Sequence, residues 1–205
     1  MFPRIVLASR NRHKLVELRA LLGIPPENLI LAADCAGAPD PDENGATFEE
    51  NALIKARALR DFTGEWAIAD DSGLTVEALG GAPGIYSARY AGVHGDDEAN
   101  NRHLISNLAP FPRPWRAAYE CVIAIAAPVN ASTDAGREFT ALGSCAGEIV
   151  PDGRGANGFG YDPFFIPDGF TQTFAELPPQ IKQTFSHRAR AAEKIKTILN
   201  GLFNS

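Results

Sequence analysis

Residues 5–31 read IVLASRNRHKLVELRALLGIPPENLIL and predict a strand, a loop, a helix and a second strand in that order. The run from Ile5 to Ala8 is short and apolar and contains β-branched residues, which is typical of a buried strand. Helical spacing then relates Leu15, Leu18, Leu21 and Leu22. A glycine and two prolines within residues 23–26 end this helix, and Leu29 to Leu31 form the second strand.

The second helix is marked by its N-terminal residues. Residues 34–45 are rich in Asp, Pro and Gly and predict a surface loop. Thr47 then matches the N-cap of a capping box, with Glu50 reaching back from the third position of a helix that ends at about Asp61. A further polar helix is expected over residues 96–108.

The second half of the chain begins with two long apolar segments. Residues 115–127 are apolar and partly alternating, and residues 138–150 repeat this character, which predicts a long antiparallel hairpin. The last third contains GRGANGFGYDP at residues 153–163 and closes with a helix from Ser186 to about Leu202. No internal repeat or convincing linker divides the chain, so we interpret residues 1–205 as one domain.

The composition excludes several classes of protein. With 205 residues and 45% hydrophobic content, the chain can bury a substantial core. A net charge of −6 argues against a protein that coats nucleic acid. The three cysteines form no CxxC pair, which is typical of reduced packing residues. We find no export signal and no apolar run near the ~20 residues that a bilayer requires, so we expect a cytoplasmic protein without a membrane partner.

Two adjacent acids carry the strongest chemical signal. Asp70 and Asp71 follow the apolar run from Ala67 to Ala69, which we interpret as a third short strand whose end delivers both carboxylates. Carboxylates beside a chain reversal lose solvation and repel each other, so they need a cation, a hydrogen-bond donor or a shared proton. A divalent metal ion is the simplest partner. The alternative is an Asx turn in which Asp71 or Ser72 only caps the next element.

An anion-binding turn is predicted at the start of the first helix. Unpaired helix amides, the positive end of the helix dipole and a lysine all favour an anion there, and the residues concerned are Ser9, Arg10, Asn11, Arg12, His13 and Lys14. The turn lacks the glycines of a Walker motif. The alternative is therefore an ordinary N-cap by Ser9 or Asn11 with solvated basic side chains.

Possible metal ligands come from separate segments. Asp42 and Glu43 lie in the predicted surface loop, Glu50 lies on the following helix, and Asp70 and Asp71 lie at the end of the third strand. Such oxygen ligands suit Mg²⁺, which takes few protein ligands and keeps water and phosphate oxygens around it. Simple solvation is the better explanation for Asp42 and for Glu43 taken individually, whereas the position of Asp71 after an apolar strand favours it as a metal ligand.

A glycine-rich loop with two aromatic residues is suited to a flat ligand. Residues 158–163, GFGYDP, allow the backbone to approach a nucleobase while a ring covers its face. The alternative is a tight turn with both rings in the core. A group of basic residues lies near the start of the last helix. Lys182 precedes Ser186, and His187 and Arg188 lie in the first helical turn. Cations there oppose the helix dipole, which favours a functional role over ordinary surface exposure.

Together these segments resemble the inosine triphosphate pyrophosphatase family over nearly the whole chain. The resemblance is carried by LASRNRHKLVEL (residues 7–18), TFEENALIKA (47–56), ADDSGLTVEALGGAPGIYSARYAG (69–92), GFGYDPFFIP (158–167) and SHR (186–188), in the family's order and at its spacing. Arg10 departs from the family pattern, which commonly has glycine or another small residue there.

The resemblance implies an α/β fold with a long mixed central sheet, flanking helices and two lobes around a ligand cleft, usually as a homodimer. It implies Mg²⁺-dependent hydrolysis of ITP, dITP and XTP to the monophosphate and pyrophosphate. Asp71 is then a metal ligand and the proposed proton acceptor, and Glu43, or Asp42 as the second choice, is a further metal ligand. Asn51 and Lys55 are implied to support the phosphates. The other residues implied to bind substrate are Ser9, Arg10, Asn11, Arg12, His13, Lys14, Ser72, Phe159, Gly160, Tyr161, Asp162, Lys182, His187 and Arg188.

Two other functions remain open from the sequence. A nucleotide sensor would use the same residues without hydrolysis, and release of pyrophosphate distinguishes the two. A glycosidase or a phosphatase would use Asp70 and Asp71 as an acid/base pair, and a phosphatase would cut the terminal bond. Asp70 and Asp71 are poorly suited to act as an acid/base pair on one bond, because adjacent residues of a strand point to opposite faces, so Asp70 is expected to be structural.

Overall fold

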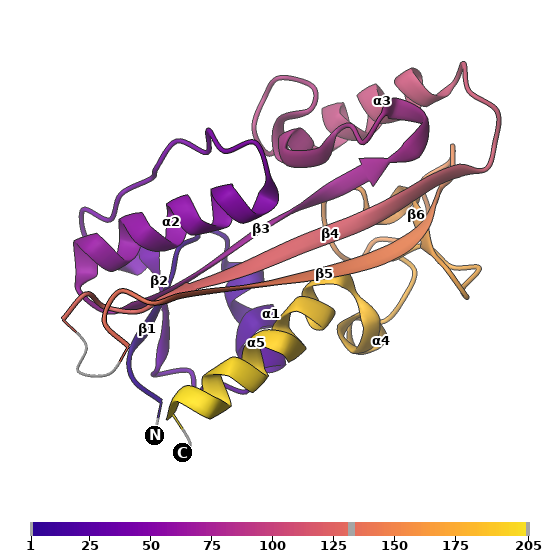
Figure 1. The fold of residues 1–205 in the computed structure, drawn as a ribbon. Helices are drawn as coiled ribbons and strands as arrows, with labels where there is room; N and C mark the ends of the chain where they lie inside the picture. Colours follow the sequence, from indigo (N-terminus) through magenta and orange to yellow (C-terminus); the bar gives the residue numbers. More distant parts are fainter. Residues whose placement is uncertain (1, 131–133, 204–205) are drawn as a thin grey trace. The chain divides into compact units, whose positions relative to one another are not determined.

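The structure is a computed structural model and describes residues 2–130 and 134–203. Six strands form a sheet in the order β2-β1-β3-β4-β5-β6 (Figure 1). They are β1 (Ile5–Leu7), β2 (Leu29–Leu31), β3 (Trp66–Val76), β4 (Trp115–Ala126), β5 (Glu138–Ile149) and β6 (Phe165–Pro167). Because β1 pairs in parallel with β2 and β3 whereas β5 and β6 are antiparallel, the predicted mixed sheet is confirmed.

The sheet is accompanied by the helices α1 (Arg12–Leu22), α2 (Phe48–Thr63), α3 (Asp97–Leu108), α4 (Pro179–Phe185) and α5 (His187–Phe203). The helices predicted from leucine spacing and from caps are confirmed. At the start of α2, Thr47 Oγ1 accepts a hydrogen bond from the Glu50 amide at 3.1 Å, and the Glu50 carboxylate accepts one from the Ala46 amide at 2.6 Å. The sequence did not predict α4, because its 7 residues are too few to show a helical period.

The chain divides into two compact units. Unit 1 consists of Met1–Asp71, Cys121–Gly143 and Arg188–Ser205, and unit 2 consists of Ser72–Glu120 and Ser144–His187. One boundary falls inside β3, between Asp71 and Ser72. We call the predicted anion-binding turn, residues 9–14, the phosphate turn, and the glycine-rich loop, residues 158–163, the aromatic loop. The phosphate turn and the predicted metal ligands belong to unit 1, and the aromatic loop belongs to unit 2.

In unit 1, helices cover both faces of the strands (Figure 1). On one face, Ile5 and Leu7 pack with residues of α1 and α5, including Leu18 and Ile195. On the other face, Val6 and Ala67 pack against Leu59 of α2. This alternation follows from the period of two along a strand. We call these two sides the α1–α5 face and the α2 face.

Unit 2 has its own core, in which Leu104 and Leu108 of α3 pack with the aromatic residues Tyr119, Phe165 and Phe174. The Tyr119 ring lies 4.9 Å from the Phe165 ring, centroid to centroid, and 5.7 Å from the Phe174 ring. Burial of such rings contributes much of the apolar stabilisation of a small core. This core supports the loops of unit 2 that carry the candidate ligand residues.

The prediction of a short third strand that ends at the two aspartates was wrong. β3 continues through Asp70, Asp71, Ser72 and Gly73 to Val76, so neither carboxylate lies at a chain reversal and no Asx turn forms there. The local sequence is misleading because polar residues and glycine are rare in strands, whereas hydrogen bonds with neighbouring strands keep this segment extended. The two carboxylates consequently point to opposite faces of the sheet.

The cysteines agree with the prediction of reduced packing residues. Cys35, Cys121 and Cys145 carry reduced thiols, and Cys121 and Cys145 are buried. Within the part of the chain that the structure describes, no helix is both long enough and apolar enough to cross a membrane.

Candidate active site

Asp70 points to the α1–α5 face of unit 1, where two cations meet it. Its side chain has no exposed surface, and its Oδ1 lies 3.0 Å from Lys14 Nζ. Its Oδ2 accepts hydrogen bonds from Arg188 Nε at 3.2 Å and from Arg188 Nη2 at 3.0 Å. Arg188 Nη1 donates to Glu17 Oε2 at 2.9 Å. Two cations and two carboxylates thus form one buried cluster, the Asp70 cluster.

The cluster keeps the Asp70 carboxylate and the Arg188 guanidinium charged. Burial by itself raises the pKa of the Asp70 carboxyl, but Lys14, Arg188 and Lys55 outweigh burial and hold that pKa well below its usual value. Burial likewise lowers the pKa of the Arg188 guanidinium, and Asp70 and Glu17 reverse this and raise it. A buried carboxylate with these partners is structural in character and places the Lys14 ammonium at a defined point.

Asp71 points to the α2 face and meets a different lysine. Lys55 Nζ lies 2.8 Å from Asp71 Oδ1, 3.3 Å from Glu43 Oε1 and 3.0 Å from the Asp70 carbonyl oxygen. Asn51, one helical turn before Lys55 on α2, donates to Asp71 Oδ2 at 3.4 Å. The capped start of α2 therefore supplies two side chains to the same carboxylate.

The Asp71 carboxylate is less stabilised than that of Asp70. Burial raises its pKa, Lys55 opposes this shift, and the nearby charge of Glu43 adds to it. For Lys55, burial lowers the pKa, but Asp71, Glu43 and Asp70 together raise it. A carboxylate that is partly desolvated and faces a second carboxylate attracts an additional cation and is a stronger base than an ordinary aspartate.

The carboxylates present fit a divalent metal ion. Glu43 and Asp71 come from different segments and converge on the Lys55 ammonium, so two carboxylates already face one cationic position. In residues 2–130 and 134–203, no group of three or more His, Cys, Asp or Glu side chains is placed to hold a metal. Mg²⁺ commonly takes one or two carboxylates and completes its coordination with water and phosphate oxygens. Asp42 is exposed, which favours Glu43 as the loop ligand.

The turn before α1 has the local hydrogen bonds of a helix start. Ser9 Oγ accepts from the Asn11 amide at 3.0 Å, and Asn11 Oδ1 accepts from the Lys14 amide at 3.3 Å. Arg10 Nε lies 3.5 Å from Asp40 Oδ2, and Arg12 Nη2 lies 3.0 Å from Asp34 Oδ1, in pairs that are largely exposed. The side chain of His13 lies outside the described residues. Exposed pairs are weak, so both arginines are available to an anion.

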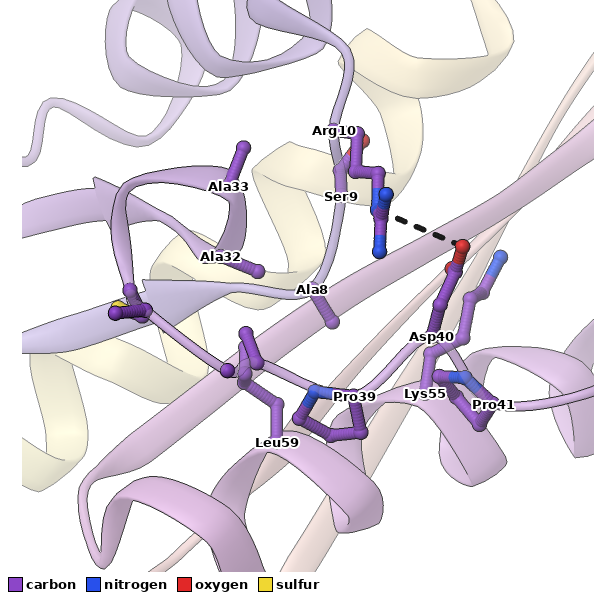
Figure 2. Close-up of a pocket in the computed structure, with 14 residues that line it drawn as sticks. Ala8, Ser9, Arg10, Ala32, Ala33, Pro39, Asp40, Pro41, Lys55 and Leu59 are labelled. Atoms are coloured by element: carbon purple, nitrogen blue, oxygen red, sulfur yellow. Dashed lines mark ion pairs between the residues drawn. The ribbon is translucent and has the colours of Figure 1, made fainter.

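A cavity of about 400 Å³ adjoins this turn. Its wall is formed by residues 8–10, by small residues and prolines of the 32–41 segment, and by Lys55 and Leu59 of α2. Figure 2 shows the Arg10 and Asp40 side chains reaching toward each other in the cavity that Lys55 also lines. The phosphate turn and the lysine that binds Asp71 thus border one hollow in unit 1.

In unit 2, the predicted aromatic loop is organised by Asp162. Its Oδ2 accepts hydrogen bonds from the Phe159 amide at 3.0 Å and from Lys182 Nζ at 2.6 Å. Gly158 has a φ of +79°, and a Cβ there would lie 1.9 Å from Asp162 Oδ2, so only glycine fits. The Phe159 ring is 40% exposed and lies 5.6 Å from Lys182 Nζ. Phe159 is therefore the ring of this loop that a ligand can reach.

The other predicted residues of the nucleoside end lie deeper. Tyr161 is buried and donates from its hydroxyl to the Ser87 carbonyl at 2.8 Å, and burial raises the pKa of that phenol. His187 is buried and stacks on Tyr119, with ring centroids 4.7 Å apart. Ser72 is half-buried in β3. Contacts of Ser72, Tyr161, His187 and Arg188 with a nucleoside remain predictions.

Three residues around the site were missed from the sequence. Glu17 holds the Arg188 guanidinium, and Asp97 and Asn101 of α3 hold the backbone of Gly160. Glu17 follows Lys14 at a spacing that places both on one side of a helix, which was the only local signal. Nothing in the sequence around Asp97 and Asn101 indicates this role, because Gly160 lies 63 positions after Asp97 and 59 positions after Asn101.

Comparison with known proteins gives consistent matches over nearly the whole chain. The model of the Ham1 family matches residues 5–198. The chain is 47% identical over 201 residues to a dITP/XTP pyrophosphatase of Desulforamulus reducens, which covers 98% of this chain and 97% of that protein. A dITP/XTP pyrophosphatase of Leifsonia xyli is also 47% identical over 201 residues and covers 97% of this chain and 96% of its own.

A solved structure has the same fold. The structure of a HAM1 protein from Coxiella burnetii superimposes with a TM-score of 0.87 at 40% identity. The match covers 98% of this chain and 100% of that one. The α/β architecture expected from the sequence resemblance is thereby confirmed.

Proposed function

The chain belongs to the Ham1 family, and we propose that it hydrolyses deaminated purine nucleoside triphosphates, namely ITP, dITP and XTP, to the monophosphate and pyrophosphate. Relatives that carry the name dITP/XTP pyrophosphatase at 47% identity support this activity. The observation that carries it is the convergence of Glu43, Lys55 and Asp71 beside the phosphate turn.

In this proposal the residues of unit 1 handle the triphosphate. Lys14 and Lys55 neutralise phosphate oxygens, and Arg10, Arg12 and the helix amides of the turn add further donors. Asp71 orients the attacking water or accepts its proton, a role suited to a carboxylate whose pKa is raised by burial. A bound Mg²⁺, held by Glu43 and Asp71, would neutralise charge on the triphosphate.

The residues of unit 2 handle the nucleoside. The exposed Phe159 ring covers the purine face, and Asp162 and Lys182 hold the loop that carries it. Hypoxanthine and xanthine have an oxygen at position 6, whereas adenine has an amino group. A pocket that offers donors to this oxygen leaves them unpaired with adenine, which costs about 1–3 kcal/mol per group and lowers kcat/KM by about 5- to 150-fold.

The test is a substrate panel with product identification. Purified protein with MgCl₂ is given ITP, dITP, XTP, ATP and GTP, and pyrophosphate is distinguished from phosphate. We expect pyrophosphate, and a higher kcat/KM for the first three nucleotides. Phosphate as the first product would favour a terminal phosphatase, binding without release of either product would favour a sensor, and equal rates on all five would refute the proposed base recognition.

A homodimer and a cytoplasmic location complete the proposal, and both rest on the family resemblance. Light scattering coupled to gel filtration measures the oligomeric state directly. A monomer at all concentrations would remove the dimer from the proposal without affecting the assignment of the reaction.

A further inference from the structure

Two side chains of α3 hold the aromatic loop of unit 2 at Gly160. The Gly160 amide donates to Asp97 Oδ2 at 2.7 Å, and the Gly160 carbonyl accepts from Asn101 Nδ2 at 2.9 Å. Asp97 and Asn101 are one helical turn apart and therefore lie on the same side of α3. Both polar backbone groups of Gly160 are thus bound by one helix, in an arrangement that we call the Gly160 clamp.

The clamp connects a fixed support to the exposed ring. α3 is anchored in the core through Leu104 and Leu108, and its Asn100 also accepts from the Ala91 amide at 2.8 Å. Gly160 directly follows Phe159, whose own amide is held by Asp162 at 3.0 Å. The backbone of Phe159 is therefore fixed on both sides, by Asp162 and by the clamp, while its ring stays exposed.

Protein stability alone does not explain why an asparagine occupies position 101. Asn101 is only 8% exposed, and its Oδ1 is buried without a hydrogen-bond partner among the described atoms. An unsatisfied buried acceptor is destabilising, and a leucine of similar size would avoid that loss. The bond from Asn101 Nδ2 to the Gly160 carbonyl is what asparagine provides at this position and leucine does not.

We propose that Asp97 and Asn101 are positioning residues for nucleobase recognition, because the Gly160 clamp presets the loop that presents Phe159. This inference rests on the proposed function. Neither residue touches the substrate, and both act through the backbone of Gly160. Without the clamp the loop would have to be ordered when the base binds, and this ordering would weaken substrate binding rather than the chemical step.

The test compares Asn101→Leu and Asp97→Ala with the wild-type protein on dITP. We expect each substitution to raise KM by about 2- to 10-fold, the loss of one hydrogen bond, with kcat within about twofold. Inhibition by inorganic tripolyphosphate, which lacks a base, should keep its wild-type constant. The melting temperature of each variant is measured alongside, and a raised KM in a variant that melts within about 3 °C of the wild-type protein does not come from loss of the fold.

Two further variants serve as controls. Glu98→Ala removes the same charge from the first turn of α3, but Glu98 pairs with Arg102 on the surface, so KM should not change. Asp97→Asn keeps an oxygen acceptor for the Gly160 amide and should retain most of the wild-type KM.

The outcomes separate the inference from the function on which it rests. A wild-type KM in both Asn101→Leu and Asp97→Ala would overturn the inference alone, as would an equal weakening of tripolyphosphate inhibition. Failure of the wild-type protein to hydrolyse dITP would overturn the proposed function. If the wild-type protein binds dITP without cleaving it, the same comparison is made on Kd, and a wild-type Kd in both variants overturns the clamp.

Discussion

Replacement of Asp70 by asparagine should destabilise the protein far more than the same change at its neighbour Asp71. Asp70 is fully buried between the Lys14 ammonium at 3.0 Å and the Arg188 guanidinium at 3.0 Å. Asp71→Asn is a matched control, because the two residues are adjacent in β3 and undergo an identical change. Only the faces of the sheet and the partners of the two carboxylates differ.

The expected magnitude follows from burial and charge. Removing one partner of a buried ion pair costs about 3–5 kcal/mol, since the remaining charges stay buried without compensation. In a protein of this size 1 kcal/mol corresponds to about 2–4 °C, so Asp70→Asn should lower Tm by about 6–20 °C. Burial disfavours the charged form of Asp71, so its neutral replacement removes that penalty while Lys55 loses a partner. We expect Asp71→Asn to melt within about 3 °C of the wild-type protein.

The pH dependence identifies the carboxylate responsible. The pKa of Asp70 is lower in the folded protein than in the unfolded chain. The charge of Asp70 therefore stabilises the fold at pH values above the usual aspartate pKa of about 3.9. This stabilisation is lost as the pH falls toward the pKa of Asp70 in the folded protein. The difference in unfolding free energy between wild type and Asp70→Asn should be constant from pH 7 to about 5 and should narrow below about 4.

The assay is thermal and urea unfolding followed by circular dichroism, in EDTA so that bound metal does not contribute. The reasoning is refuted if Asp70→Asn melts within about 2 °C of wild type, or if Asp71→Asn is the less stable variant. A difference that stays constant down to pH 3 would show that the charge of Asp70 is not the stabilising feature.

Three further outcomes are expected. Asp71→Asn should lower kcat by about 10²- to 10⁴-fold on dITP while the fold stays intact, and turnover near the wild-type value would remove its role as proton acceptor. Gly158→Ala should lower Tm more than Gly160→Ala. A Cβ at Gly158 would lie 1.9 Å from Asp162 Oδ2, whereas a Cβ at Gly160 would have no other atom within 4 Å. Equal melting temperatures of the two variants would contradict this. Burial raises the pKa of the Cys121 thiol to about 12, so iodoacetamide at pH 8 should label Cys35 and spare Cys121 in the native protein, as peptide mass spectrometry can measure.

Features that depend on neighbours along the chain could be predicted. The leucine spacing of α1 and the capping box of α2 each involve residues three or four positions apart, so the sequence pattern covers the same residues as the contacts that it predicts. The hairpin of β4 and β5 was likewise visible as two apolar segments around a polar break, and the two strands are neighbours in the sheet. Residue chemistry located the candidate site segments, the family resemblance assigned their roles, and their contacts with substrate remain predictions.

The sequence alone determined the position of the long helices and of the β4–β5 hairpin, because hydrophobic period and capping are local properties of the chain; it did not determine the short helix α4 or the true end of β3. Only the tertiary structure decided what each charged side chain meets. Asp70 binds Arg188, 118 positions away, and Arg188 binds Glu17, 171 positions away. Such pairs are set by strand pairing and by the alternation of faces along β3, which also separates Asp70 from Asp71. No local pattern in the sequence encodes them, because they exist only once the sheet has formed.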